Sequence, residues 1–272
     1  MPELAEVEFF RKRWSAGIGG RVDRVHVHGT KRIFRGEAVE KLPAVLTDAV
    51  LVDSERKAKQ MLFRLSTATL GIHLGMTGEL LVAGADFVPG KHDHLVIYQR
   101  ERALIFRDPR LFGRVRFTLG TDDPAWWKVL PEELTARSFT KARLREVLQR
   151  RGKAPLKAVL LMQEFFPGIG NWMADEILWR GGLLPDRRSG TLTELEIARL
   201  YREIREVVKI SLKTIGNSTG ETFGEPPRGW LFHERWTAKG CCPKHGVTLN
   251  TATVGGRTTR WCGICQPIGK LL

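Results

Sequence analysis

The first 240 residues of this 272-residue chain contain no cysteine, and all four cysteines lie in the last 32 residues. A disulfide-stabilised secreted protein would distribute its cysteines along the chain, so the clustering argues against one. The pattern instead indicates a metal site that forms in a reducing compartment. Free thiols are the alternative that the clustering alone leaves open.

Long apolar runs are also absent, since no segment approaches the roughly 20 apolar residues that a membrane helix needs. The first ten residues are acidic and lack the apolar segment of a secretory signal peptide. We therefore expect a cytoplasmic protein with no membrane partner. A hydrophobic content of 42% is sufficient for two compact domains and a small additional module.

Acidic residues are scarce relative to basic ones, 30 against 44, which gives a net charge of +14. Such an excess favours a polyanionic partner, with nucleic acid ahead of an anionic membrane surface. Basic residues occur along the whole length, so the charge does not belong to a single tail. Solubility, the alternative explanation, requires less charge than this.

Residues 1–120 consist mainly of short segments in which apolar and polar residues alternate, separated by Gly, Asp and Pro. Alternation of this kind predicts strands, and their number favours a β-sandwich or a flattened barrel. A short helix over Leu4–Ala16 precedes them. The expected strands are Val22–His28, Val50–Ser54, Met61–Leu65, Leu70–Leu74, Leu80–Val82, Leu95–Tyr98, Ala103–Arg107 and Arg114–Thr118.

Residues 125–215 follow a 3.6-residue periodicity instead, which predicts helices. A linker at Thr121–Pro124 separates the two regions, so the expected fold class is α+β. The segment Gly216–Trp230 is rich in Gly, Pro, Ser and Thr and is expected to be a loop, and residues 231–272 form a small Cys/His module. The expected helices are Lys141–Arg151, Leu156–Gln163, Asn171–Arg180 and Thr193–Thr214.

Four residues of the last module have the paired spacing of a tetrahedral zinc site. Cys242-x2-His245 is followed, after sixteen residues, by Cys262-x2-Cys265. Cys241 could replace Cys242, but Cys-x3-His is the less regular ligand pair. Four protein ligands leave no open position, so we expect one structural Zn²⁺.

The residues between the two ligand pairs are expected to form a hairpin. Val247–Leu249 and Thr258–Trp261 are its predicted strands, and Gly255-Gly256 is its turn. Arg257 is then held at the hairpin tip as a rigidly presented cation.

The chain begins Met1-Pro2-Glu3, and the expected removal of Met1 leaves a secondary amine on Pro2. An α-amino group titrates near pH ~8, so a sizeable fraction is nucleophilic at neutral pH, whereas lysine, near ~10.4, needs tuning. Glu3 and Glu6 place two carboxylates beside this amine. Such an amine can attack a sugar C1′, expel a base and hold the opened sugar as an iminium. A disordered terminus is the alternative.

A Gly-rich turn, Pro167–Asn171, leads into the predicted helix Trp172–Trp179. Backbone N–H groups at a helix N-terminus, together with the Asn171 amide, form a nest for a phosphate. Lys153 and Lys157 precede the turn, and both could reach the same phosphate. An ordinary packing corner between two helices is the alternative.

Two further turns carry large apolar side chains, Met76 within His73–Gly78 and Phe112 within Asp108–Gly113. An enzyme that acts on a base must extrude it and fill the gap, and Met, Phe and Arg suit that wedge. Core residues that cap a sandwich are the alternative, which these residues alone favour.

His92 and His94 have a His-x-His spacing that places both on one face of a strand. The same spacing occurs in metal sites, but no third ligand is nearby in the sequence. A metal at this position is therefore the less favoured interpretation.

Taken together and in order, these motifs resemble those of the formamidopyrimidine-DNA glycosylase and endonuclease VIII family of bifunctional DNA repair enzymes. The resemblance covers the full length and is closest to the formamidopyrimidine branch. The motifs that carry it are Pro2-Glu3-Leu4, Ala58-Lys59, His73–Gly78, Lys91–His94, Asp108–Gly113, Gly168–Asn171 and the terminal Cys/His hairpin.

The resemblance implies an N-terminal β-sandwich over residues 1–120, a helix–two-turn–helix domain over 125–215 and a zinc finger over 231–272. It also implies that the partner is double-stranded DNA containing damaged bases, and we expect a monomer that is associated with the nucleoid if the source is bacterial. The implied activity is that of a glycosylase and AP lyase that removes oxidised bases, mainly 8-oxoguanine and ring-opened formamidopyrimidines.

The resemblance also implies roles for single residues. Pro2 is implied as the nucleophile that forms a Schiff base, Glu3 as the acid/base, and Lys59 as the lysine of β-elimination. Arg257 is implied in δ-elimination and in phosphate binding. Contacts with the DNA backbone are implied for His92, Arg110, Lys153 and Asn171, and filling of the void left by the base is implied for Met76, Arg110 and Phe112.

Three departures from the family pattern bear on these implications. Ala5 stands where the family commonly has a second proline, and His245 replaces the usual second cysteine of the finger, although histidine also binds zinc. The segment Gly216–Trp230 is shorter than, and differs in composition from, the family loop that embraces an extruded oxidised purine. Substrate choice is therefore the least determined property.

Three alternatives to this function remain open. One is an endonuclease VIII-like enzyme that prefers oxidised pyrimidines, and another is a non-catalytic lesion-binding protein on the same scaffold. The third is a zinc-finger regulator that reads bases, for which the sequence shows no obvious recognition helix. The four residues retained for catalysis argue against a mere binder, and they are Pro2, Glu3, Lys59 and Arg257.

Overall fold

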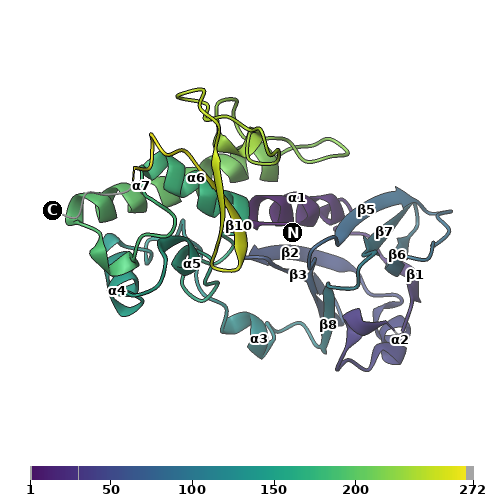
Figure 1. Ribbon diagram of the computed structural model, residues 1–272. Coiled ribbons are helices and arrows are strands. Elements are labelled where there is room, and N and C mark those ends of the chain that lie inside the picture. The colour runs from purple at the N-terminus through teal and green to yellow at the C-terminus, as the bar shows by residue number, and fades with distance from the viewer. Residues whose placement is uncertain (1, 30, 268–272) are drawn as a thin grey trace. The chain divides into compact units, whose positions relative to one another are not determined.

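The computed structural model describes residues 2–29 and 31–267 and separates the chain into two compact units, Met1–Leu130 and Pro131–Leu272 (Figure 1). The first unit contains the predicted strands, and the second contains the predicted helices and the Cys/His hairpin, which confirms the α+β fold class. The domain boundaries at 120, 125, 215 and 231 remain predictions. No helix in the described part is long and apolar enough to cross a membrane.

Two sets of expectations concern residues at the chain ends. Residues 268–272 of the predicted zinc module lie outside the described residues. Met1, whose removal we expect, also lies outside the described residues.

The eight predicted strands are present in the first unit and pair antiparallel in two four-stranded sheets (Figure 1). One sheet has the order β1-β6-β7-β5 and the other β2-β3-β4-β8, so the fold is a sandwich rather than a closed barrel. The strands are β1 (Val22–Val27), β2 (Leu51–Lys57), β3 (Gln60–Leu65), β4 (Ala68–His73), β5 (Glu79–Gly84), β6 (Asp93–Gln99), β7 (Arg102–Arg107) and β8 (Arg114–Leu119).

Alternate side chains of both sheets form one hydrophobic core together with the first helix. On β3, Met61, Phe63 and Leu65 are buried in this core, which is the two-residue repeat that predicts the strand. Helix α1 (Leu4–Ser15) adds the fully buried Trp14. Each such side chain stabilises the fold by roughly 1.5–3 kcal/mol relative to an exposed position.

Two short helices of the first unit are not predicted by the sequence, α2 (Leu42–Leu46) and α3 (Ala125–Lys128). They have five and four residues, which is too few to show a 3.6-residue period. Helix α3 still shapes the sheet surface, because a Cβ at Gly71 on β4 would lie 2.3 Å from the Trp126 ring. Glycine at this position therefore lets α3 lie against the strand.

The second unit contains the predicted helices, and their ends follow known capping rules. Thr193 and Glu196 form a capping box at the start of α7, and Gly182 ends α6 with a left-handed φ of 64°. Helices α6 and α7 pack against each other. The helices are α4 (Lys141–Arg150), α5 (Leu156–Leu160), α6 (Asn171–Gly181) and α7 (Glu194–Ser211).

The C-terminal hairpin consists of β9 (Asn250–Val254) and β10 (Arg257–Trp261) (Figure 1). The prediction of its first strand at Val247–Leu249 is wrong. Those residues bond instead to the segment before them, since Leu249 N–H donates to Gly240 and Val247 accepts from Cys242.

The hairpin turn is formed by Gly255 and Gly256, with φ values of 60° and 72°. Two successive residues in the left-handed region are what a two-residue type I′ turn requires. A Cβ at Gly255 would also lie 2.9 Å from the Cβ of Ala158 in α5. Glycine is thus needed both for the turn and for its close approach to the helix, and the prediction of the turn is confirmed.

Candidate functional site

The start of α1 fixes the first two candidate residues. Glu3 is the N-cap, is 2% exposed, and donates its backbone N–H to the Glu6 carboxylate at 3.2 Å. Glu3 and Glu6 form a capping box, which satisfies N–H groups that have no partner within the helix. Pro2 is half-buried and bonded to this fixed residue, so its nitrogen has a defined place at the helix start.

Lys59 lies in the tight turn between β2 and β3 and is 7% exposed. The preceding Ala58 has a φ of 55°, a left-handed conformation that costs a non-glycine residue about 1–3 kcal/mol. Arg56 links the turn to α1, because its guanidinium donates to the Ala58 carbonyl and to the Glu8 carboxylate, each at 3.2 Å. One arginine therefore couples the lysine turn to the helix at the start of the chain.

Glu8 is the fixed anion on which this coupling depends. Burial alone would raise the pKa of its carboxyl, but the hydrogen bond and charge of Arg11, with the charges of Arg56 and Lys12, hold that pKa below its ordinary value. Arg11 also donates to the Ser54 hydroxyl at 2.7 Å, which joins α1 to β2. The carboxylate is thus ionised at neutral pH and keeps Arg56 in place.

A buried carboxylate, Asp108, joins the two turns that carry the candidate wedge. Its Oδ1 accepts from the Thr77 hydroxyl at 2.9 Å and from the Arg110 N–H at 3.2 Å, and its Oδ2 accepts from the Gly113 N–H at 2.7 Å. The turns also touch through their backbones, since a Cβ on Gly75 would lie 2.3 Å from the backbone of the facing turn. The two turns therefore form one rigid structure.

This structure exposes the three candidate wedge residues. Met76 is 37% exposed, Phe112 is 39% exposed, and Arg110 is exposed with its guanidinium 4.9 Å from the centroid of the Phe112 ring. The alternative that Met76 and Phe112 are core residues capping the sandwich is therefore wrong. Apolar side chains held outward by a rigid turn are available for contact with another molecule.

His92 and His94 have different environments. His92 is half-buried just before β6, whereas His94 is 1% exposed, with its Nε2 2.9 Å from the Asp108 carbonyl oxygen. The pairing register shifts between Asp93 and Leu95, which interrupts the simple alternation expected here. Neither histidine belongs to a group of potential metal ligands among residues 2–29 and 31–267.

In the second unit, Asn171 contacts the hairpin at the residue that follows Arg257. Asn171 Nδ2 donates to the carbonyl of Thr258 at 3.0 Å, and the exposed Arg257 is the preceding residue. Lys153, also exposed, lies in the turn that follows α4. The start of α6 and the hairpin tip thus share one hydrogen-bonded contact.

The Gly-rich turn before α6 is braced from inside the protein. Gln163 accepts from the Gly168 N–H at 3.2 Å and donates to the Ile169 carbonyl at 2.7 Å. Gly168 has a φ of 90°, which favours glycine. One of the N–H groups expected to face a phosphate is therefore bonded within the protein.

The expectation that Lys157 reaches a phosphate is wrong, because this side chain is fully buried. Its Nζ lies 2.6 Å from Asp175 Oδ1 and donates to the Thr258 carbonyl and the Thr259 hydroxyl. Arg235 forms a second ion pair with Asp175 at 2.7 Å. Buried charges need such partners, and these partners join α5, α6 and β10.

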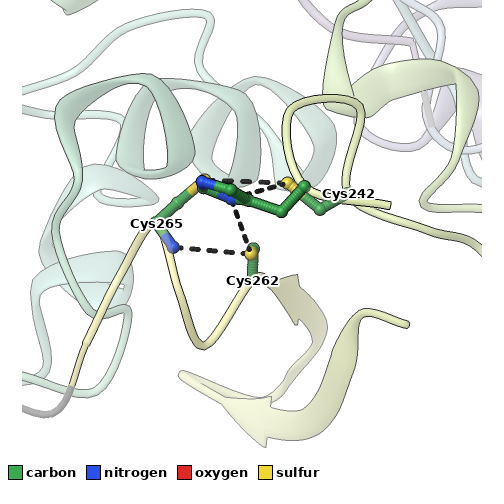
Figure 2. Close-up of side chains that lie close together, drawn as sticks. Cys242, Cys262 and Cys265 are labelled. Atoms are coloured by element: carbon green, nitrogen blue, oxygen red, sulfur yellow. Dashed lines mark hydrogen bonds between the residues drawn. The ribbon is translucent and has the colours of Figure 1, made fainter. Parts of the chain in front are cut away.

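The four predicted metal ligands converge at one point, and Figure 2 shows the three cysteines of this group, Cys242, Cys262 and Cys265, close together. His245 Nδ1 lies 3.7, 3.7 and 3.3 Å from the Sγ atoms of Cys242, Cys262 and Cys265, and the Cys242 and Cys265 sulfurs are 3.6 Å apart. All four donor atoms lie within 4.8 Å of one another. Cys241 is not in this group, so the donor set is the one expected from the spacing.

A further titratable residue, Glu176, was not singled out from the sequence. It is fully buried on α6 and accepts from the Phe232 N–H at 3.1 Å. Burial raises the pKa of its carboxyl to about 8, against the lowering effect of that hydrogen bond and of Arg180 and Lys244. The only sequence signal is an acidic residue within an otherwise apolar helix.

Comparisons with known proteins agree with the geometry. Residues 1–115 match the family model of the formamidopyrimidine-DNA glycosylase N-terminal domain, and residues 130–222 match the formamidopyrimidine-DNA glycosylase H2TH domain. A formamidopyrimidine-DNA glycosylase of Geobacter metallireducens is 36% identical over 98% of this chain and 100% of its own length. One of Pelotomaculum thermopropionicum is 33% identical over the same shares.

Solved structures show the same similarity. Lactococcus lactis Fpg (MutM) in complex with DNA containing N7-benzyl-Fapy-dG has a TM-score of 0.85 and 27% identity, over 98% of this chain and 100% of that one. The same Lactococcus protein in complex with abasic-site DNA also has a TM-score of 0.85 and 27% identity, over 97% and 99%.

Replacement of Asp108 tests whether one buried carboxylate holds the exposed wedge. We expect Asp108→Ala to lower the free energy of unfolding by about 2–4 kcal/mol, since three donors, of which the Gly113 N–H is buried, lose a charged acceptor. Denaturant unfolding measures this change. Asp86→Ala, an exposed acid of the same unit, is the control and is expected to change stability by no more than about 0.5 kcal/mol. Equal effects of the two substitutions would contradict the role of Asp108.

The raised pKa of Glu176 predicts how stability depends on pH. Because the folded pKa is above the unfolded value, the contribution of this acid is complete below about pH 4.5 and is lost as the pH rises through about 8. The wild-type free energy of unfolding should therefore decline between these values more steeply than that of Glu176→Gln. Denaturant unfolding of the metal-loaded protein across this pH range measures both slopes, and parallel slopes would contradict the assignment.

Proposed function

Because the chain belongs to the formamidopyrimidine-DNA glycosylase family, we propose that it is a bifunctional DNA glycosylase and AP lyase of base excision repair. Its substrates are oxidised bases in double-stranded DNA, mainly 8-oxoguanine and ring-opened formamidopyrimidines. The observation that carries the proposal is the fixed position of Pro2 beside the buried Glu3 at the start of α1. We also expect it to act as a monomer, in the cytoplasm with the DNA.

The proposed chemistry starts at the Pro2 nitrogen. Its lone pair attacks C1′ of the damaged nucleotide as the N-glycosidic bond breaks, and the base leaves with the bonding electrons and a proton. The opened sugar is then held as an iminium on the same nitrogen. The iminium acidifies the C2′ proton, so elimination of the 3′ phosphate and then of the 5′ phosphate can follow.

Three residues of this chain are proposed to move protons in these steps. The Glu3 carboxyl, held by the capping box, is close in the chain to the amine and assists the opening of the sugar. Lys59, held in the strained β2–β3 turn, acts in β-elimination. Arg257, exposed at the hairpin tip, acts in δ-elimination and binds phosphate.

The remaining candidates are proposed to position the DNA. Met76, Arg110 and Phe112 fill the space that the extruded base leaves, which agrees with their exposure on a rigid turn. The proposed contacts with the DNA backbone come from His92, Arg110, Lys153 and Asn171.

We propose that the metal is one structural Zn²⁺. Zn–S bonds of about 2.3 Å and Zn–N bonds of about 2.0–2.1 Å place tetrahedral donor atoms roughly 3.5–3.8 Å apart. Three of the four donor distances given above, 3.6, 3.7 and 3.7 Å, lie within this range, and the fourth, between His245 and Cys265, is 3.3 Å. The ion would be bound by Cys242, His245, Cys262 and Cys265, and it supplies rigidity to the hairpin rather than a step of the reaction.

An N-terminal substitution tests the amine mechanism. The duplexes carry 8-oxoguanine, a ring-opened purine, an oxidised pyrimidine or an abasic site. We expect borohydride to trap the wild type on the two purine lesions and on the abasic site, and Pro2→Gly to lose the adduct. The control is Pro89→Gly in the loop before β6, which should trap as the wild type does.

The ranking of duplexes decides the substrate branch. A preference for an oxidised pyrimidine would favour the endonuclease VIII-like alternative. No adduct on any duplex, with a free N-terminal proline shown by intact mass, would favour the non-catalytic lesion-binding protein.

A cysteine pair tests the metal site. We expect Cys262→Ser to reduce bound zinc from one ion per chain to nearly none, because it removes one of four tetrahedral ligands. Cys241→Ser removes a thiol outside the donor set and should keep one ion. Elemental analysis of the purified proteins measures both, and an unchanged zinc content in Cys262→Ser would show that the ligand set is wrong.

A further inference from the structure

A small basic pocket lies on the outer side of the β2-β3-β4-β8 sheet, in the first unit. Its volume is about 170 Å³, and it is lined by Arg35, Gln60, Gly71, His73, Arg114 and Arg116. Three guanidinium groups thus line one small concavity that contains no carboxylate. Drug-sized ligands occupy roughly 300–1,000 Å³, so this pocket suits a smaller anionic group.

The arginines of this pocket form no direct ion pair within the described protein, and Glu37 is the acid whose charge acts on Arg116 from nearby. No ion pair links Arg35, Arg114 or Arg116 to an acid among the described residues, and the buried Nε of Arg114 has no hydrogen-bond partner there. Burial and the nearby charges of Arg114 and Arg35 lower the pKa of Arg116, against the effect of Glu37. The free protein therefore holds like charges close together at a cost in energy.

Arg64 on the same sheet shows the contrast. Its guanidinium lies within 3.1 Å of the carboxylates of Asp53, Glu55 and Asp123. The charge of Arg64 is therefore compensated by three ion pairs within the protein. Arg114 and Arg116 on β8 have no such ion pair among the described residues.

His73 contributes a neutral donor to the pocket. Burial, together with the charges of Lys59, Arg116 and Arg35, lowers the pKa of this imidazole to about 4. Its Nδ1 accepts from the Gly75 N–H at 3.1 Å, so at neutral pH the single ring proton is on Nε2. The ring therefore offers an N–H group beside the arginines without adding a further charge.

We propose that Arg114 and Arg116, with Arg35 and His73, bind one backbone phosphate of the DNA beside the damaged nucleotide. Guanidinium groups match the geometry of phosphate oxygens and form short charge-assisted hydrogen bonds with them. A phosphodiester would supply the direct ion-pair partner that these arginines lack within the described protein. This inference rests on the proposed function, and it assigns a further DNA contact to the outer sheet.

Arg116 is also held in a defined orientation. Its guanidinium lies 4.8 Å from the centroid of the Trp126 ring, and α3 places that ring over Gly71. A cation above an aromatic face is favourable and restricts the side chain. The unpredicted helix α3 thus restrains one arginine of the pocket through Trp126.

Salt-dependent binding to a duplex with a stable abasic-site analogue tests the proposal. The pocket variant is Arg114→Gln with Arg116→Gln, and the matched control is Arg100→Gln with Lys128→Gln, which removes two exposed charges of the same unit. We expect the pocket variant to bind about tenfold more weakly and its log–log salt slope to fall by ~0.9, the value for one phosphate. The control should keep the wild-type slope.

A backbone scan and a free anion distinguish the source of the phosphate. A methylphosphonate at one position should weaken the wild type and leave the pocket variant unaffected. Inorganic phosphate should shift the His73 imidazole resonances of the wild type, and it should shift those of the pocket variant much less. A shift with inorganic phosphate but equal salt slopes on DNA would overturn the backbone assignment in favour of a free anion.

The outcomes separate this inference from the proposed function. If the wild type is trapped on damaged DNA while the pocket variant keeps the wild-type salt slope, the pocket assignment fails and the enzyme assignment stands. If the wild type does not bind the duplex, both fail. Should the glutamine variant unfold, Arg114→Lys with Arg116→Lys keeps the charge without the planar guanidinium, and it should keep the slope and lose affinity. Wild-type affinity in that variant would overturn the proposal.

Discussion

Within each unit, a buried carboxylate that binds several donors or cations holds candidate residues in place. Asp108 accepts from three donors and joins two turns of the sandwich, while Asp175 pairs with Lys157 and Arg235 in the helical unit. An isolated buried charge is costly, so each carboxylate is stable only when its partners are all present. Segments far apart in sequence are thereby fixed relative to one another within each unit.

Much of the fold follows from the sequence because the responsible forces act over short distances. Strand β3 and helix α7 each bury one face. This gives β3 a two-residue alternation and α7 a 3.6-residue period, so the pattern alone predicts the strand and the helix. The metal ligands can also be predicted from the sequence, because tetrahedral coordination by two ligand pairs imposes a short spacing within each pair. The reactive start, Pro2-Glu3, is recognised by its residue types and by family resemblance rather than by any period.

Where the sequence was misleading, the deciding contacts are distant along the chain. From the sequence, Lys157 is expected to be a surface lysine. In the fold it is buried and contacts Asp175 and Thr259, which are distant along the chain. Met76 and Phe112 are residue types that are common in cores, and only their exposure in the folded structure, on turns held by Asp108, shows that they point outward. No local pattern contains this information, which depends on tertiary pairing.

The Lys157–Asp175–Arg235 network also bears on how the C-terminal hairpin folds. Arg235 lies before the first metal ligand, and the backbone N–H of Arg260 on β10 donates to Asp175 at 3.3 Å. A peptide cut out to contain only the metal-binding hairpin would leave these groups without the acid that α6 provides. The hairpin is therefore a part of a larger cooperative folding unit, and its backbone amides should open to solvent exchange together with those of α5 and α6.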